Sequence, residues 1–100
     1  MHILDAQTTN FEKYHDTSVA RGVDKTFIRL TEEIGEIAKA LRNGDRDNLA
    51  EEIADGMAWL LTLASLNDVD AQAAYIKKYG TSECFRCHQV RCICPEERNV

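Results

Sequence analysis

The stretch LTEEIGEIAKAL, residues 30–41, decides how this chain folds. Its apolar side chains recur in steps of three and four, and the spacing continues back to Phe27, which is typical of one stripe on an amphipathic helix. We expect this helix to begin near Asp24 as its N-cap. It should end at Gly44, where a glycine in the left-handed conformation can stop it.

The segments on either side continue the helical pattern. A first helix is expected within residues 3–15, followed by a loop at DTSVARG, residues 16–22. A third helix is expected to open at DNLAEE, where Asn48 and Glu51 resemble a capping box, and a fourth to span residues 69–79. No segment alternates with a period of two, so we predict an all-α chain, a bundle of about four helices.

The composition changes abruptly after Gly80. Residues 1–80 are expected to form the helical domain, and residues 81–100 a cysteine-rich tail. From Gly56 onward the third helix is apolar nearly all round, which a chain of 100 residues can hardly cover by itself. We therefore expect this helix to form an interface between copies of the chain.

The overall charge narrows the choice of partners. A formal net charge of −5 argues against binding nucleic acid or an anionic membrane surface, since both favour an excess of Lys and Arg. The longest uncharged run, residues 56–67, is too short to span a bilayer, and no basic start followed by an apolar run suggests a signal peptide. We expect a cytoplasmic protein.

Two pairs of acids flank the apolar stripes of the second and third helices. Glu33 and Glu36 are spaced i, i+3, and Glu52 and Asp55 repeat that spacing. If the two helices pack antiparallel through their stripes, the pairs converge, and four carboxylates repel one another unless cations lie between them. Oxygen ligands of this kind suit Mg²⁺ or Mn²⁺. The alternative is that each pair is a solvated helix face.

Two glycines lie beside these acids. A glycine inside a helix costs about 1 kcal/mol relative to alanine, so each is expected to have a use. Gly56 follows Asp55 on the apolar stripe and would allow the helices to approach closely. Gly35 precedes Glu36 and could leave room for a ligand.

The motif EEIGE, followed after fifteen residues by EIAD, resembles the E-E-x-x-E … E-x-x-D signature of the MazG-like all-α nucleoside triphosphate pyrophosphohydrolases. The resemblance covers roughly residues 24–80. It implies a helical bundle that assembles as a dimer or a dimer of dimers, and Mg²⁺-dependent hydrolysis of a nucleotide to its monophosphate and pyrophosphate. The metal ligands that it implies are Glu33, Glu36, Glu52 and Asp55.

Further site residues follow from the same resemblance. Glu32 is a candidate catalytic residue that orients or activates water, and its alternative is an ion pair with Arg29 or Lys39. In the fourth helix, Ala74 and Tyr75 stand where family members usually carry Lys and Asn. The candidate phosphate contacts that remain are Lys77 and Lys78, and the alternative is that both are solvated lysines near a helix C-terminus.

Because the fourth helix lacks the usual Lys and Asn, the sequence is also compatible with other functions. Phosphoribosyl-ATP pyrophosphohydrolase is the nearest alternative, because that enzyme shares the fold and the acid motif. A non-catalytic helical dimerisation module with a zinc tail is a second. Trp59, one turn after Asp55, is expected either to stack on a base or to pack in the core or an interface.

The tail spaces its cysteines as C-x2-C-x4-C-x-C. Four thiolates within eleven residues are typical of a closed tetrahedral Zn²⁺ site. An iron–sulfur cluster and a redox C-x-x-C are the alternatives, and His88 could replace one cysteine as a ligand. The predicted ligands of this structural zinc are Cys84, Cys87, Cys92 and Cys94.

Overall fold

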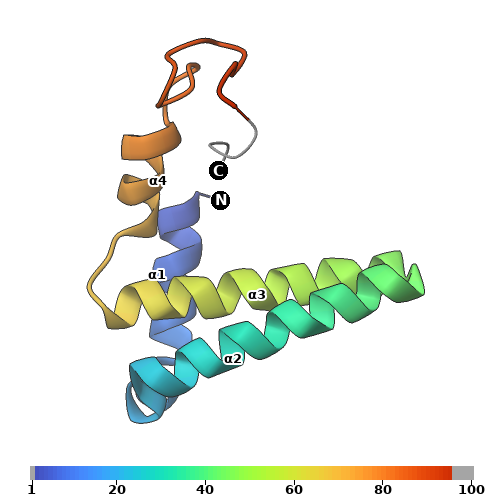
Figure 1. Cartoon of the computed structure of the whole chain (residues 1–100). Coiled ribbons are helices and arrows are strands. Elements are labelled where there is room, and N and C mark those ends of the chain that lie inside the picture. Colours follow the sequence, from blue (N-terminus) through green and yellow to red (C-terminus); the bar gives the residue numbers. More distant parts are fainter. Residues whose placement is uncertain (1, 96–100) are drawn as a thin grey trace.

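The computed structural model describes residues 2–95, and all its regular structure is helical (Figure 1). No strand occurs within these residues, so the all-α prediction is confirmed. None of the helices in this part of the chain combines the length and the apolar character of a membrane span. The helices are α1 Ile3–Lys13, α2 His15–Asn43, α3 Arg46–Leu66 and α4 Ala71–Tyr79.

The antiparallel pair α2–α3 is the centre of the fold and extends to one side of α1 and α4 (Figure 1). Gly44 ends α2 in the left-handed conformation, with φ 67° and ψ 20°, as predicted. The start of α3 was predicted wrongly, because its cap is Asp45 rather than Asn48. The Asp45 carboxylate accepts a hydrogen bond from the Asn48 amide at 3.0 Å, so the helix gains a further turn.

The expected loop at residues 16–22 is wrong, because α2 already begins at His15. The Ser18 amide donates to the Tyr14 carbonyl at 2.9 Å, and Ser18 is fully buried. The break is confined to Gly22, whose φ of 81° and ψ of 176° are open to glycine but not to other residues. The chain changes direction there, and the second part of α2 starts close to the predicted Asp24.

A buried glutamine joins α1 to the connection between α3 and α4. Gln7 Nε2 donates to the Val69 carbonyl at 2.7 Å and to Ser65 Oγ at 3.0 Å, and Gln7 Oε1 accepts from the Ala71 amide at 3.0 Å. The side chain is 6 % exposed, and these bonds use most of its hydrogen-bonding capacity. They place α4 beside α1 (Figure 1).

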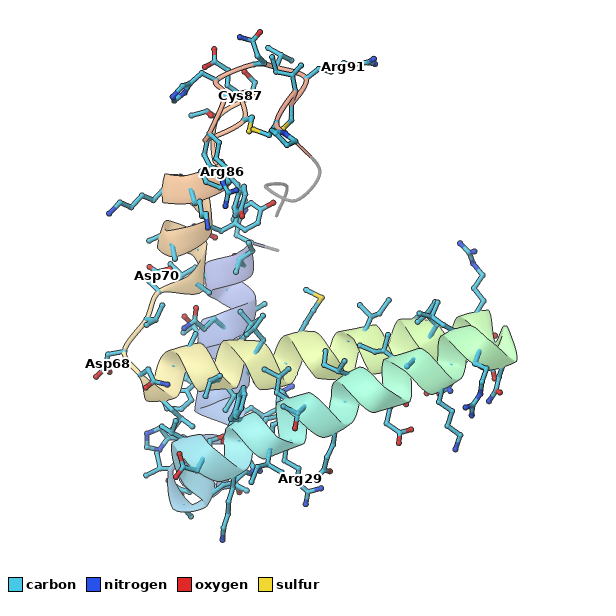
Figure 2. All side chains as sticks on the ribbon, in the orientation of Figure 1. Arg29, Asp68, Asp70, Arg86, Cys87 and Arg91 are labelled. Atoms are coloured by element: carbon cyan, nitrogen blue, oxygen red, sulfur yellow. The ribbon has the colours of Figure 1, made fainter. Side chains whose placement is uncertain are left out.

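The ends of α4 are set by the two residues that flank it. Asp70, labelled where α4 begins in Figure 2, caps it by accepting from the Ala73 amide at 3.0 Å. The helix therefore starts two residues later than the predicted Val69, and it stops before Gly80 as predicted.

The chain by itself encloses little apolar surface. Its radius of gyration is 15.9 Å, whereas a compact domain of this length has about 13 Å. Ala40 is the one fully buried apolar residue among residues 2–95, and Met57 and Leu60 of α3 are more than half exposed. A groove of about 690 Å³ lined almost entirely by apolar side chains runs between α3 and α4. As predicted, the rest of the described chain leaves large apolar side chains of α3 exposed.

Candidate functional site

Three acids from α2 and α3 come together in the middle of the helix pair. Carboxylate oxygens of Glu33, Glu52 and Asp55 all lie within 4.8 Å of one another. Glu33 and Glu52 are partly buried, whereas Asp55 is exposed. Glu36 is exposed and does not belong to this group, although its charge acts on Glu33. The structure therefore brings three of the four predicted ligands together and leaves the fourth at the edge.

The cluster is short of positive charge. The hydrogen bond with Glu52 raises the pKa of Glu33 to about 7, with further contributions from burial and from the negative charges of Glu52, Asp55 and Glu36. Glu33 Oε1 is buried and has no hydrogen-bond partner among residues 2–95. None of the ion pairs found in that range involves these acids. An orphaned buried oxygen among crowded carboxylates fits a hard divalent cation.

The two glycines differ in their surroundings. A Cβ on Gly56 would lie 3.5 Å from Ile37 Cδ1 and 3.8 Å from Glu33 Cγ, which are ordinary van der Waals distances. Gly56 therefore faces α2 next to the acids, but the helices do not approach so closely there that a glycine is required. A Cβ on Gly35 would meet nothing within 4 Å among the described residues. Gly35 is exposed, and no contact within residues 2–95 requires a glycine there.

A cleft of about 330 Å³ adjoins the acids where α1, the start of α2 and α3 meet. The Arg21 guanidinium lies 4.6 Å from the centroid of the Trp59 ring, and both side chains line the cleft. Asp55 belongs both to the cleft wall and to the acid cluster. The lining residues are Asn10, Tyr14, Ser18, Arg21, Asp55, Ala58, Trp59 and Thr62.

Several cleft residues were missed in the sequence. Ser18 and Arg21 lie in the segment that was expected to be a loop, so their i, i+3 spacing was not interpreted as a helix face. Asn10 is oriented by donating to Thr62 Oγ1 at 2.9 Å and to the Ala58 carbonyl at 3.4 Å. These contacts depend on how α1 crosses α3, which no local pattern specifies.

The family description "MazG nucleotide pyrophosphohydrolase domain" matches residues 21–81. The chain belongs to this family. It is also 38 % identical over 50 residues to the phosphoribosyl-ATP pyrophosphatase of Methanosphaerula palustris (strain ATCC BAA-1556 / DSM 19958 / E1-9c). That match covers 50 % of this chain and 50 % of the relative, so the chain spans about half the length of the curated relative.

The MazG match includes Glu32 and the two lysines, but these lie apart from the acid cluster. Glu32 is exposed, and its carboxylate lies 3.4 Å from Arg29 Nη1, which is the alternative that the sequence left open. Arg29 points away from α3 (Figure 2). Lys78 Nζ lies 4.8 Å from the centroid of the Phe85 ring, near the tail, and Lys77 precedes it in the last turn of α4. Their roles in catalysis and phosphate binding stay predictions.

The four cysteines form a second cluster beyond the MazG match. Their sulfur atoms lie within 4.8 Å of one another, in the loop that follows α4, where Figure 2 labels Cys87. Backbone amides of Cys87 and Arg86 lower the pKa of Cys84 to about 6. The hydrogen bond with Cys92 raises the pKa of Cys94 to about 12. His88 is not part of the cluster.

Proposed function

We propose that the chain is a nucleotide pyrophosphohydrolase whose divalent cation, Mg²⁺ or Mn²⁺, is held by Glu33, Glu52 and Asp55, with Glu36 beside them. The observation that carries the proposal is the group of three carboxylates within 4.8 Å, one of which has a buried oxygen without a hydrogen-bond partner among the described residues. The membership of the MazG family supports the same reaction class.

The cation, when bound, neutralises phosphate charge and polarises the water that attacks phosphorus. The chain's own residues position the nucleotide. Because Asp55 lies in both the cleft and the cluster, a nucleoside in the cleft has its phosphates next to the acids. Trp59 offers a ring for the base, and among residues 2–95 Arg21 is the one cationic residue that lines the cleft. Arg21 therefore suits a phosphate contact, which the fourth helix lacks at its usual positions.

The substrate that we propose is a nucleoside or deoxynucleoside triphosphate, hydrolysed to the monophosphate and pyrophosphate. Phosphoribosyl-ATP is the second candidate, because a relative named as a phosphoribosyl-ATP pyrophosphatase is 38 % identical over half of the chain. Both substrates present a triphosphate on a pentose, so the same acids and cleft would serve either reaction.

We also propose that the protein assembles as a homodimer or homotetramer. The exposed apolar residues of α3 and the groove between α3 and α4 support this, since unpaired surfaces of this kind usually mark an interface. Light scattering of the purified protein tests it, and a monomer at micromolar concentration would contradict the proposal.

The test of the reaction is pyrophosphate release from a panel of nucleoside triphosphates and phosphoribosyl-ATP, with and without Mg²⁺. Glu52→Gln removes one carboxylate of the cluster, and Glu51→Gln on the exposed side of the same turn is the matched control. We expect release that depends on Mg²⁺ and on Glu52 but not on Glu51. If no nucleotide is hydrolysed and Glu52→Gln binds Mg²⁺ as the unmodified protein does, the chain is a non-catalytic dimerisation module instead.

A further inference from the structure

The four-cysteine cluster has the dimensions of a site for one ion. Zn²⁺ in a tetrahedral site lies about 2.3 Å from each sulfur, which separates the sulfurs by about 3.8 Å. Cys84 Sγ and Cys94 Sγ are 3.9 Å apart, and all four sulfurs lie within 4.8 Å. A disulfide would bring two of them to about 2.05 Å, and the described residues form no disulfide among these four cysteines.

Backbone amides around the cluster donate hydrogen bonds to two of its sulfur atoms. The Arg86 amide donates to Cys84 Sγ at 3.4 Å, and the Cys94 amide donates to Cys92 Sγ at 3.3 Å. Two further bonds close the turn: the His88 amide donates to the Cys84 carbonyl, and the Cys84 amide donates to the Gln89 carbonyl, each at 2.9 Å. Amides that point at sulfur orient metal-bound thiolates and offset their charge.

We propose that Cys84, Cys87, Cys92 and Cys94 bind a single Zn²⁺, and that this ion clamps the tail onto the end of α4. The MazG match stops at residue 81 and does not include these cysteines. The site is separate from the acid cluster and does not depend on the reaction proposed above.

The clamp works through Phe85, which lies between two of the ligands in the sequence. Its ring meets the Tyr79 ring edge to face, with centroids 5.6 Å apart and planes at 89°. Lys78 Nζ lies over the Phe85 ring, 4.8 Å from its centroid. Cys84 and Cys87 lie on either side of Phe85, so binding both to the ion holds the backbone around this residue. We therefore expect the Phe85 ring to stay packed against the end of α4 only while the ion is bound.

Metal analysis tests the site directly. Protein purified under reducing conditions should contain about one zinc per chain. Replacing zinc with Co²⁺ should give the intense sulfur-to-metal absorption and the visible bands of a tetrahedral thiolate site. Iron in place of zinc, or no bound metal, would overturn the proposal.

Variants separate the ligands from their neighbours. Cys92→Ser should abolish the cobalt spectrum and the bound zinc, since it removes one of four ligands. His88→Asn is the matched control: it removes an adjacent imidazole but suits the left-handed backbone, with φ of 60°, at this position. Equal zinc content in Cys92→Ser and the control would contradict the assignment.

The clamp has its own measurement, hydrogen exchange of the intact protein before and after zinc is removed with a chelator. We expect at least tenfold faster exchange in residues 77–94 and little change in the α2–α3 pair. Phe85→Ala should keep its zinc yet lose protection at the end of α4. If zinc removal leaves the exchange of these residues unchanged, the ion does not act as a clamp.

Discussion

Replacing Glu33 with glutamine should stabilise the metal-free protein while removing its response to Mg²⁺. The hydrogen bond with Glu52, burial and the neighbouring negative charges raise the Glu33 pKa from 4.5 to about 7, so ionising this carboxylate costs the folded protein free energy that it does not cost the unfolded chain. If the whole rise in pKa acted on stability, it would lower the free energy of unfolding at high pH by about 3.4 kcal/mol. Because the cluster is partly exposed and water screens it, we expect about 1–2 kcal/mol, or a thermal midpoint higher by about 5–10 °C.

The sign of the effect depends on pH. A carboxyl group whose pKa is higher in the folded protein than in the unfolded chain binds more protons when folded. The unmodified protein should therefore lose stability as the pH rises from about 4.5 to about 7, and Glu33→Gln should not show that contribution. The variant should be the more stable protein at pH 8, and the two should differ little at pH 4.

Thermal unfolding at pH 4 and pH 8, with and without Mg²⁺, measures both effects. Mg²⁺ should raise the midpoint of the unmodified protein at pH 8 and should hardly change that of Glu33→Gln. Glu51→Gln, on the same helix pair but outside the cluster, should respond to Mg²⁺ as the unmodified protein does. A variant that is less stable than the unmodified protein at pH 8, or equally responsive to Mg²⁺, would refute this reasoning.

Three further predictions concern other parts of the chain. Arg21→Ala should raise the KM for the nucleotide about tenfold or more with little change in the thermal midpoint, and steady-state kinetics would contradict this if KM were unchanged. Gly22→Ala should lower the free energy of unfolding measured with denaturant by at least about 1 kcal/mol, because φ is 81° at this position. Gly35→Ala, where a Cβ would meet open space, should be neutral or stabilising. The reverse order of stabilities would be inconsistent with the structure. Leu60→Asp should shift the assembly measured by light scattering toward monomer, and an unchanged mass would remove α3 from the interface.

The α2–α3 pair was predictable because its determinants are local. The apolar stripe, the stop at Gly44 and the i, i+3 acid spacing are all set within one or two helical turns, and packing the stripes brings Glu33 to Glu52 and Asp55. The four cysteines came together for the same reason, since they lie within eleven residues. The spacing of the acid and cysteine motifs located both clusters, although Glu36 was also expected among the acids and lies outside that group.

The cleft was not predictable in the same way. Asp, Thr, Ser and Gly in residues 16–22 suggested a loop, yet the segment is helical up to Gly22 and buries Ser18. Its tertiary contacts outweigh the weak helix propensity of these residues. The place of Asn10 beside Thr62 depends on the crossing of α1 over α3, and residues 52 positions apart leave no periodic signal.

The hydrogen bonds of Gln7 have a consequence for the order of folding. They join residues 58, 62 and 64 positions apart, whereas α2 and α3 are connected by a tight turn. The short connection costs less chain entropy to close, so the helix pair should form early and the junction at Gln7 late. A Gln7→Leu substitution should then speed unfolding far more than it slows folding, which stopped-flow measurements would detect. The end of α3 and the start of α4 would be the last parts of the helical domain to form their native contacts.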